Sequence, residues 1–256
     1  MLDYADIERS AAVDEQYIKT VETNLGGVLS RIRSASGGRE VQLLLATKTV
    51  SAETVNALSK RVGHLLIGEN KAQELLEKYD ALEKDRLTVH FIGHLQTNKV
   101  RQIIDKVEMI HSLDRIELAR EISKRARAAG KVMPVLVEIN IAAEPEKSGV
   151  LPEEAEEFVR AAATLEGIRI KGLMTMAPAR ITPDEYRGYF SQTKVLFDRI
   201  KAADIKGADM EMLSMGMSDS YAEAAECGSD MVRVGSAVFG KRVYPEAKNE
   251  NNDQPI

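Results

Sequence analysis

Eight short apolar runs alternate with longer amphipathic segments along most of the chain, and this alternation limits the possible folds more than any other feature. Apolar runs of this length, bounded by glycine, proline or polar residues, favour strands that are buried on both faces. Strands that alternate with helices pair in parallel, so eight such units predict an α/β fold, a closed (β/α)8 TIM barrel. The runs cover residues 41–46, 64–67, 89–92, 107–111, 134–141, 168–174, 210–214 and 230–234.

Two of the amphipathic segments give clear helix signals. Residues 5–34 predict a long extra helix before the first strand, because apolar side chains recur there at spacings of three and four. Residues 183–203 predict another helix, which begins at Thr182-Pro183, a favourable start sequence. A further helix is predicted to begin at Leu151-Pro152.

Length and composition narrow the class of protein. A chain of 256 residues suits a single barrel domain, expected over residues 1–242, and residues 243–256 form a polar tail that we expect to be disordered. Lys and Arg total 35 against 40 Asp and Glu, a net charge of −5 that leaves no basic footprint for nucleic acid. The single cysteine, Cys227, excludes an internal disulfide and a cysteine metal cluster. The acidic N-terminus is unlike a signal peptide, and no apolar stretch approaches the roughly 18 residues of a membrane span, so we expect a cytoplasmic protein without a membrane partner.

Polar residues follow the predicted strands directly, where a barrel of this kind carries its functional groups. Lys48 follows the first apolar run, and Asn70 follows the second. A lysine at the end of a buried strand is partly desolvated, which favours the neutral, nucleophilic amine. An isolated lysine in such a place is more often a turn residue that reaches solvent, so the assignment of Lys48 depends on the rest of the site.

The loops after the seventh and eighth runs have the composition of a phosphate site, which barrels often place there. They contain Ser214-Met215-Gly216-Met217-Ser218 and Gly235-Ser236. Glycines let the backbone approach a ligand, and serine hydroxyls add hydrogen bonds. A phosphate site opposite a nucleophilic lysine suits a phosphorylated aldehyde.

Other sites are disfavoured. His90 and His94 have a spacing that binds zinc on a helix, but they lie on a predicted strand, so no metal site is expected. His64, His90 and His111 are instead predicted to be buried or to line the barrel. The stretch from Gly216 to Ser220 lacks the last glycine of a nucleophile elbow, which disfavours a serine hydrolase.

With these residues the sequence resembles the pyridoxal phosphate homeostasis protein family, whose members are single-domain barrels of fold type III, like the N-terminal domain of alanine racemase. The similarity covers roughly residues 5–242, and the order of all its blocks together makes it specific. The blocks are residues 44–49, 67–74, 90–99, 110–112, 144–149, 172–175, 213–218 and 232–236.

The resemblance implies a bound pyridoxal 5′-phosphate (PLP) and a role for three side chains around it. Lys48 is implied to form a Schiff base with PLP, and Asn70 to lie near its ring. Arg233 is implied to face the pyridine nitrogen, which must then accept a hydrogen bond and stay unprotonated, because arginine carries donors only.

The resemblance also implies the phosphate contacts. It places the phosphate on Ser214, Gly235 and Ser236, with a contribution from the backbone around Met215. Racemases and decarboxylases with this barrel add a C-terminal β-domain that brings a second catalytic residue across a dimer interface. No such domain is expected after the last predicted strand, which favours a monomer with half of a racemase's proton-transfer groups.

The leading hypothesis is therefore a non-enzymatic PLP carrier in intracellular vitamin B6 homeostasis, with PLP-requiring apoenzymes as partners. One alternative is a PLP-dependent amino-acid racemase or lyase with weak activity, acting through the same lysine. Another is a Schiff-base aldolase that uses Lys48 on a sugar phosphate, which the block from Arg233 to Ser236 disfavours.

Overall fold

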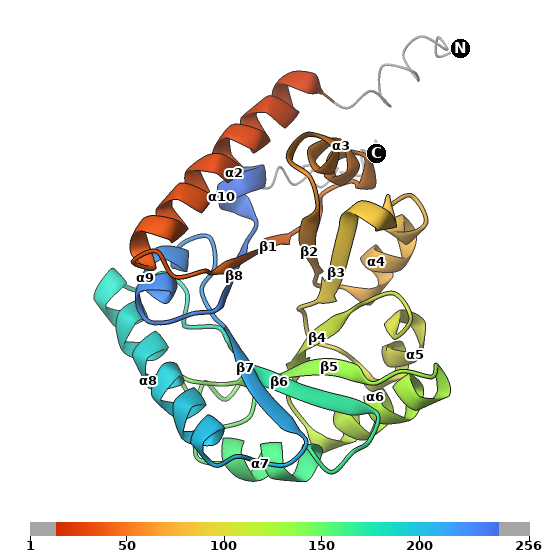
Figure 1. The fold of residues 1–256 in the computed structure, drawn as a ribbon, viewed down its shortest axis with the longest axis vertical. Coiled ribbons are helices and arrows are strands. Elements are labelled where there is room, and N and C mark those ends of the chain that lie inside the picture. The colour runs from red at the N-terminus through yellow and green to blue at the C-terminus, as the bar shows by residue number, and fades with distance from the viewer. Residues whose placement is uncertain (1–13, 241–256) are drawn as a thin grey trace, which may run out of the picture.

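Eight parallel strands form a closed barrel in sequence order, and β8 pairs with β1 to close it (Figure 1). The computed structural model describes residues 14–240, so the predicted tail at 243–256 and the start of the predicted N-terminal helix lie outside the described residues. The predicted (β/α)8 fold is confirmed, and each strand end lies within two residues of the apolar run that predicted it. The strands are β1 Gln42–Ala46, β2 Leu65–Glu69, β3 Leu87–Phe91, β4 Met109–Leu113, β5 Met133–Ile139, β6 Ile168–Thr175, β7 Ala208–Ser214 and β8 Met231–Val234.

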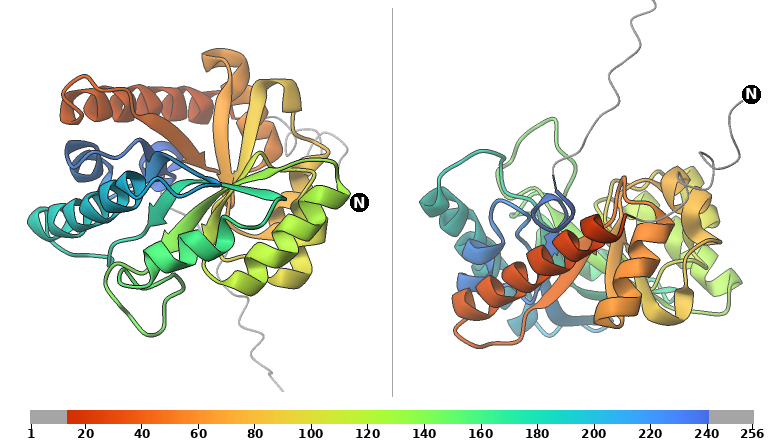
Figure 2. Two further views of the ribbon diagram at one scale, coloured as in Figure 1. Left: turned by 60° about the horizontal axis from the view of Figure 1, so that its bottom comes forward. Right: turned by 90° about the horizontal axis from the view of Figure 1, so that it is seen from above.

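The helices surround the barrel on its outside, as the two turned views also show (Figure 2). The long helix α2 precedes the first strand, in agreement with the sequence. The helices are α2 Glu15–Ala35, α3 Ala52–Val62, α4 Ala72–Tyr79, α5 Val100–Ile103, α6 Ile116–Ala128, α7 Ala155–Ala162, α8 Pro183–Ala202, α9 Tyr221–Glu226 and α10 Ser236–Phe239, with short 3-10 turns η1 Lys84–Arg86 and η2 Thr97–Lys99.

The core has two parts, because successive side chains of a strand point to opposite faces of the sheet. On β1, Leu45 joins the large cluster between the sheet and the helices. Its neighbours Leu44 and Ala46 pack inside the barrel with Ile92 and Met231. Complete burial of a leucine such as Leu45 contributes about 1.5–3 kcal/mol, so this alternation fixes which side chains of each strand point toward the barrel axis.

Helix α2 closes the outer ring against α10, the last described helix. The Tyr17 hydroxyl donates to the carbonyl of Phe239 at 2.9 Å, and the Asn24 amide donates to the carbonyl of Val238 at 3.1 Å. Figure 1 shows α2 and α10 side by side, although they lie at opposite ends of the described chain. The first described helix is thereby attached to the last described helix at the same side of the barrel.

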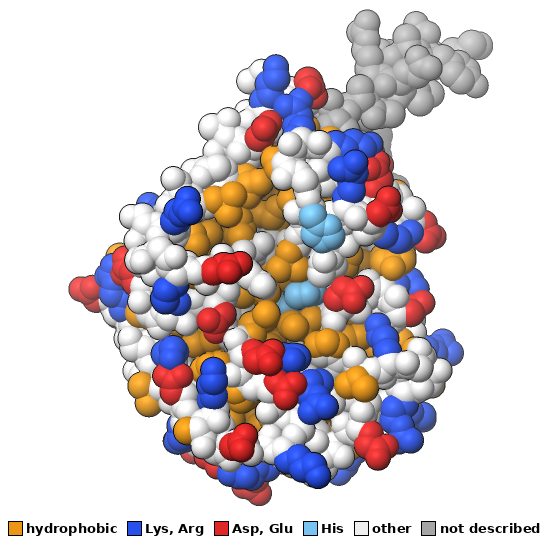
Figure 3. All heavy atoms as spheres, viewed as in Figure 1, with side chains coloured by type: hydrophobic (Ala, Val, Ile, Leu, Met, Phe, Trp, Pro, Cys, Tyr) orange, Lys and Arg blue, Asp and Glu red, His pale blue; other side chains and the backbone are white. Residues whose placement is uncertain are grey.

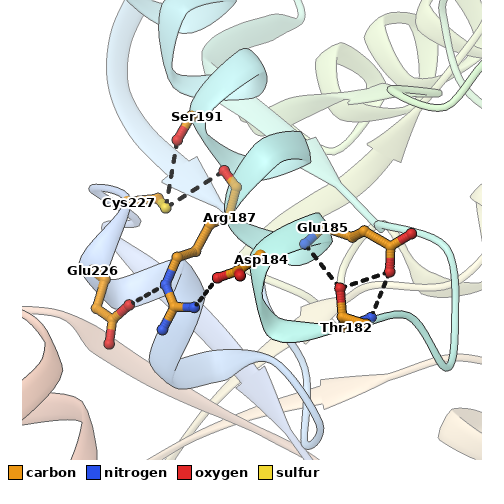
Figure 4. Close-up of polar contacts among 7 residues, drawn as sticks. All are labelled: Thr182, Asp184, Glu185, Arg187, Ser191, Glu226 and Cys227. Carbon is orange, nitrogen blue, oxygen red and sulfur yellow. Dashed lines mark hydrogen bonds and ion pairs between the residues drawn. The ribbon is translucent and has the colours of Figure 1, made fainter.

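Helix α8 begins as its sequence predicts. Thr182 is the N-cap and forms a capping box with Glu185, and Pro183 occupies the first turn. Figure 4 shows this cap and, one turn further, Arg187, which bonds to Asp184 and to Glu226 of α9. These contacts attach α8 to α9.

Two local predictions differ from the structure. Helix α7 begins at Ala155, three residues after Pro152, because residues 152–154 form turns. His64 is exposed, since it precedes β2 at the opposite end of the barrel from the predicted site, where its ring bonds to the Thr88 hydroxyl at 2.9 Å. His90 and His111 are buried, as predicted.

Candidate functional site

A cavity of about 970 Å³ lies at the C-terminal ends of the strands, between the ends of β1 and β8. Its volume is that of a pocket for a small organic ligand. On the face of the molecule shown in Figure 3, hydrophobic side chains gather over the barrel, and most charged side chains lie around them. The cavity wall contains five of the seven predicted site residues, namely Lys48, Asn70, Arg233, Gly235 and Ser236.

Lys48 reaches the cavity because of where β1 ends. Ala46 faces the barrel interior, and the alternation of the strand carries Lys48 to the same side two residues later. The residue lies in a turn that is closed by a 2.9 Å hydrogen bond from the N–H of Val50 to the carbonyl of Thr47. Thr49, the next residue in this turn, has a left-handed backbone with φ of 65°.

Asn70 follows β2 and is half-buried at the cavity wall. Its backbone lies against Gly93, where a Cβ atom would stand only 2.0 Å from the carbonyl oxygen of Asn70. Glycine at position 93 therefore lets the loop after β3 pack directly on the Asn70 backbone, and any larger residue would displace one of the two loops.

Arg233 lies on β8 with 4% of its surface exposed, and its guanidinium reaches the cavity. Nη1 donates to the hydroxyl of Ser214 at 2.7 Å, and Nη2 donates to the carbonyl of Thr175 at 2.9 Å. Burial lowers the pKa of Arg233 to about 10, while the charge of Glu138 opposes this shift. The guanidinium is thus a cation at neutral pH, and with five N–H donors it can also donate to a ligand.

Other ionisable groups are buried within the barrel around Arg233. Burial raises the pKa of Glu138 to about 7, the charge of Asp114 adds to the rise, and Arg233 opposes it. His90 Nδ1 lies 3.0 Å from His111 Nε2. Burial lowers the pKa of His90 to about 4 and that of His111 well below its usual value, so both rings are neutral at neutral pH. The barrel interior therefore contains the Arg233 cation together with the Glu138 carboxyl group, whose pKa lies near neutrality.

Gly235 and Ser236 form the cavity wall beside the start of α10, and Ser236 is exposed. Ser218 lines the same wall from the loop after β7. Its hydroxyl accepts hydrogen bonds from the N–H groups of Gly235 and Ala237, both at 3.2 Å. Ser218 therefore connects the two loops that were predicted to bind phosphate.

Ser214 and Met215, the other two predicted residues, do not line the cavity. Both side chains are fully buried, and the Ser214 hydroxyl is the acceptor for Arg233. The N–H of Met215 donates to the carbonyl of Met231 at 3.1 Å, within the sheet. The structure thus places these residues behind the wall, in contact with Arg233 and β8 rather than with the cavity.

Several lining residues were not predicted from the sequence. Met176 and Met217 line the cavity with more than a third of their surface exposed, and Tyr17 reaches it from α2. Met217 lies in the stretch from Ser214 to Ser218 that the sequence nominated as a phosphate loop, although no role was assigned to it. Met176 directly follows β6, so the rule that nominated Lys48 could have found it. Tyr17 has no such local signal, because only the contact between α2 and α10 brings it to the cavity.

Neither a metal site nor a membrane span is found within residues 14–240. No group of three or more His, Cys, Asp or Glu side chains in this range is arranged to hold a metal ion. No helix in the same range is long and apolar enough to cross a bilayer.

Comparison with known proteins agrees with the fold and with the sequence blocks. A family model described as "Alanine racemase, N-terminal domain" matches residues 29–243. A relative from Aquifex aeolicus named "Pyridoxal phosphate homeostasis protein" is 40% identical over 225 residues, which cover 86% of this chain and 97% of the relative.

Two solved structures are similar over almost their whole length. A crystal structure described as that of "an unknown protein" from Bifidobacterium adolescentis superposes with a TM-score of 0.84 and 35% identity, covering 89% of this chain and 98% of the other. PipY from Synechococcus elongatus, solved with PLP bound, gives a TM-score of 0.76 and 26% identity, covering 86% of this chain and all of PipY. The chain therefore belongs to the alanine racemase N-terminal domain family, in the branch whose members are named pyridoxal phosphate homeostasis protein.

Proposed function

We propose that this protein binds PLP as a Schiff base on Lys48 and carries or buffers it for intracellular vitamin B6 homeostasis. The observation that carries the proposal is that one cavity joins an amine, a fixed guanidinium and a serine-glycine wall: Lys48, Arg233 and Gly235-Ser236. The relatives named for PLP homeostasis and the PLP-bound structure of PipY support it.

The donor set suits the chemical groups of PLP. The Lys48 amine condenses with the aldehyde, forming a carbon–nitrogen double bond and releasing water. Arg233 donates to the pyridine nitrogen. Its guanidinium is held in place for this contact by hydrogen bonds to Ser214 and Thr175. Ser236 and Ser218 bind the phosphate through their hydroxyls, Gly235 lets the backbone approach it, and Asn70 lies beside the ring. When bound, PLP supplies a reactive aldehyde and an aromatic ring that can withdraw electrons.

We propose a carrier rather than an enzyme because of the acid/base groups at the cavity. Racemisation needs one group on each face of the substrate, and Lys48 supplies one. Tyr17 and Asp219 also line the cavity. The Tyr17 hydroxyl donates to the carbonyl of Phe239 and burial raises its pKa, so it keeps its proton, and Asp219 is exposed at the cavity wall. The protein then acts as a monomer that gives PLP to PLP-requiring apoenzymes.

The test is a visible spectrum of the protein with PLP, before and after borohydride, followed by peptide mapping. Borohydride reduces the Schiff base and fixes PLP to its lysine, and we expect the label on Lys48. Lys48→Ala should lose the visible band while keeping a wild-type far-ultraviolet circular dichroism spectrum. Lys60→Ala, at a surface lysine, is the matched control. A label on another lysine would overturn the assignment, and the absence of any visible band would overturn the Schiff base.

A further inference from the structure

The turn that carries Lys48 is held by one lysine of helix α4. The Nζ of Lys78 lies 2.9 Å from the carbonyl of Thr47 and 3.1 Å from that of Val50. It also lies 2.7 Å from Oε1 of Glu69. A lysine ammonium has three N–H donors, and these three acceptors match them. Because 90% of the Lys78 side chain is shielded from solvent, water competes little for these hydrogen bonds.

Two carboxylates complete this cluster, which we call the Lys78 brace: Thr47, Glu69, Glu74 and Lys78. Glu69 is fully buried at the end of β2 and accepts a hydrogen bond from the Thr47 hydroxyl. Glu74, one turn before Lys78 on α4, accepts the N–H of Thr49. Burial raises the pKa of Glu69, and the charge of Lys78 opposes that rise. The Lys78 ammonium thus binds both the turn at residues 47–50 and the buried carboxylate of Glu69.

The brace holds a backbone conformation that the turn would not keep alone. Thr49 has φ of 65°, and a β-branched residue is strongly disfavoured in this left-handed region. Lys48 lies between residues whose backbone groups are fixed on both sides: the carbonyl of Thr47 before it, and the N–H of Thr49 after it. The direction in which the Lys48 side chain leaves the backbone is therefore set by α4 and β2.

A buried ion cluster is by itself weak evidence for added stability, because the cost of desolvating its charges can exceed their mutual attraction. The Lys78 brace differs from a cluster that joins two helices, because three of its contacts are made to the backbone of a single turn. The backbone groups it binds belong to residues 47, 49 and 50, which flank the cavity lysine, while Glu69, Glu74 and Lys78 do not line the cavity. This arrangement is that of a support for a functional side chain.

We propose that Lys78 is a positioning residue for Lys48: through the turn at 47–50 it fixes the approach of the Lys48 amine to PLP and slows the release of PLP. The inference rests on the proposed function, because it takes Lys48 as the residue that holds PLP. It adds that the lifetime of the bound cofactor is set from helix α4, outside the cavity.

The test compares Lys78→Met, which keeps the length of the side chain and removes the three donors, with the wild type. Glu74→Ala is a milder second variant, because it removes the acceptor of the Thr49 N–H and a 3.5 Å ion pair with Lys78 but leaves the contact between Lys78 and Glu69. Lys60→Met is the matched control, a lysine of the neighbouring helix α3 whose partner is Glu83 at the surface. All proteins are checked for folding by thermal melting and far-ultraviolet circular dichroism.

The first measurement uses the protein without PLP and follows amide hydrogen exchange of the peptide that covers residues 47–52. Exchange should be at least about tenfold faster in Lys78→Met and in Glu74→Ala, and unchanged in Lys60→Met. Unchanged exchange in both brace variants overturns the inference whether or not PLP binds.

The second measurement uses the PLP-loaded protein and follows visible circular dichroism per bound PLP and the rate of PLP release. We expect a weaker signal and release at least about tenfold faster, since small misplacements of a reacting group have effects of this order. A loosened turn with wild-type signal and release rate would reduce the brace to a structural role and overturn the positioning. A wild type without any visible band instead refutes the proposed function, a result that the first measurement does not produce.

Discussion

Arg233 and Ser214 form a 2.7 Å hydrogen bond behind the wall of the cavity, in which Nη1 of the guanidinium donates to the serine hydroxyl. A second bond, from Nη2 to the carbonyl of Thr175, connects β8 to β6. The guanidinium is therefore held by three neighbouring strands at once, and the edge that it offers to the cavity is set by the sheet rather than by its own flexible stem.

Replacing the guanidinium should change the electronic state of bound PLP. In Arg233→Gln the pyridine nitrogen loses a permanently charged donor, so its protonation and the visible spectrum should shift, while phosphate affinity stays within about tenfold. Spectra recorded from pH 5 to 9 measure this, with Arg169→Gln, at an exposed arginine, as the control. An unchanged spectrum and pH dependence would show that Arg233 does not face the nitrogen.

Two serines should have separable effects. Ser236→Ala removes a hydroxyl from the cavity wall and should weaken the preference for PLP over pyridoxal by about fivefold, the effect of one hydrogen bond. Ser214→Ala removes the acceptor of Arg233 and should shift the spectrum instead, with the phosphate preference unchanged. Dissociation constants for both ligands decide between them. If Ser214→Ala loses the preference for PLP and Ser236→Ala keeps it, then Ser214 binds the phosphate, as the sequence indicated.

The buried carboxyl of Glu138 should make stability depend on pH. Its pKa rises from the ordinary 4.5 to about 7, so below pH 4.5 both the folded and the unfolded state hold the proton. Between these values the unfolded state releases a proton that the folded state retains, and stability falls as pH rises, by up to about 3 kcal/mol. Glu138→Gln should therefore be more stable than the wild type at pH 8 and similar at pH 4.

Urea unfolding at pH 4, 6 and 8 measures this difference. Glu157→Gln, at an exposed position of α7, is the control and should follow the wild type throughout. A stability difference between Glu138→Gln and the wild type that does not change with pH would contradict the raised pKa.

The proposed lack of turnover can be tested directly with amino acids. A positioned acid/base group is typically worth about 10²–10⁴-fold in rate, so with Lys48 alone racemisation should be negligible beside that of a true racemase. The PLP-loaded protein is incubated with L-alanine in deuterated water, and α-deuterium and D-alanine are measured. Slow exchange without inversion is expected. Fast exchange with inversion would refute the carrier function, and its loss in Tyr17→Phe would identify Tyr17 as the second group.

The fold could be read from the sequence because its main signals are local. Each strand is a short apolar run next to a breaker, and a run such as the one preceding Thr47-Lys48 carries this signal without help from the rest of the chain. The start of α8 was equally local, since Thr182 and Pro183 act within one turn. Helix α7 was placed too early, because Pro152 marks the start of a turn as readily as the start of a helix.

The candidate site could be read only in part. Position after a strand nominated Lys48, Asn70, Gly235 and Ser236, and all four line the cavity. It does not show which serine of a loop points into the cavity. Ser214 is the last residue of β7 and faces Arg233, whereas Ser218, four residues later, reaches the wall. That difference depends on how the loop after β7 packs against the residues after β8. Such a contact between segments distant in the sequence cannot be predicted from a local pattern.

The closure of the barrel has a consequence for the order in which a newly made chain can assemble. Strand β1 pairs along most of its length with β8, 189 positions later, and Tyr17 bonds to Phe239, 222 positions later. Both sides of the cavity therefore form only after these later residues have been synthesised. At a usual rate of translation that delay is roughly ten seconds or more. During this interval β1 has a bare edge and the lysine has no opposing wall. Under the proposed function, the chain can bind PLP only after β8 and α10 have been synthesised. A truncated product released by the ribosome would therefore not sequester the vitamin.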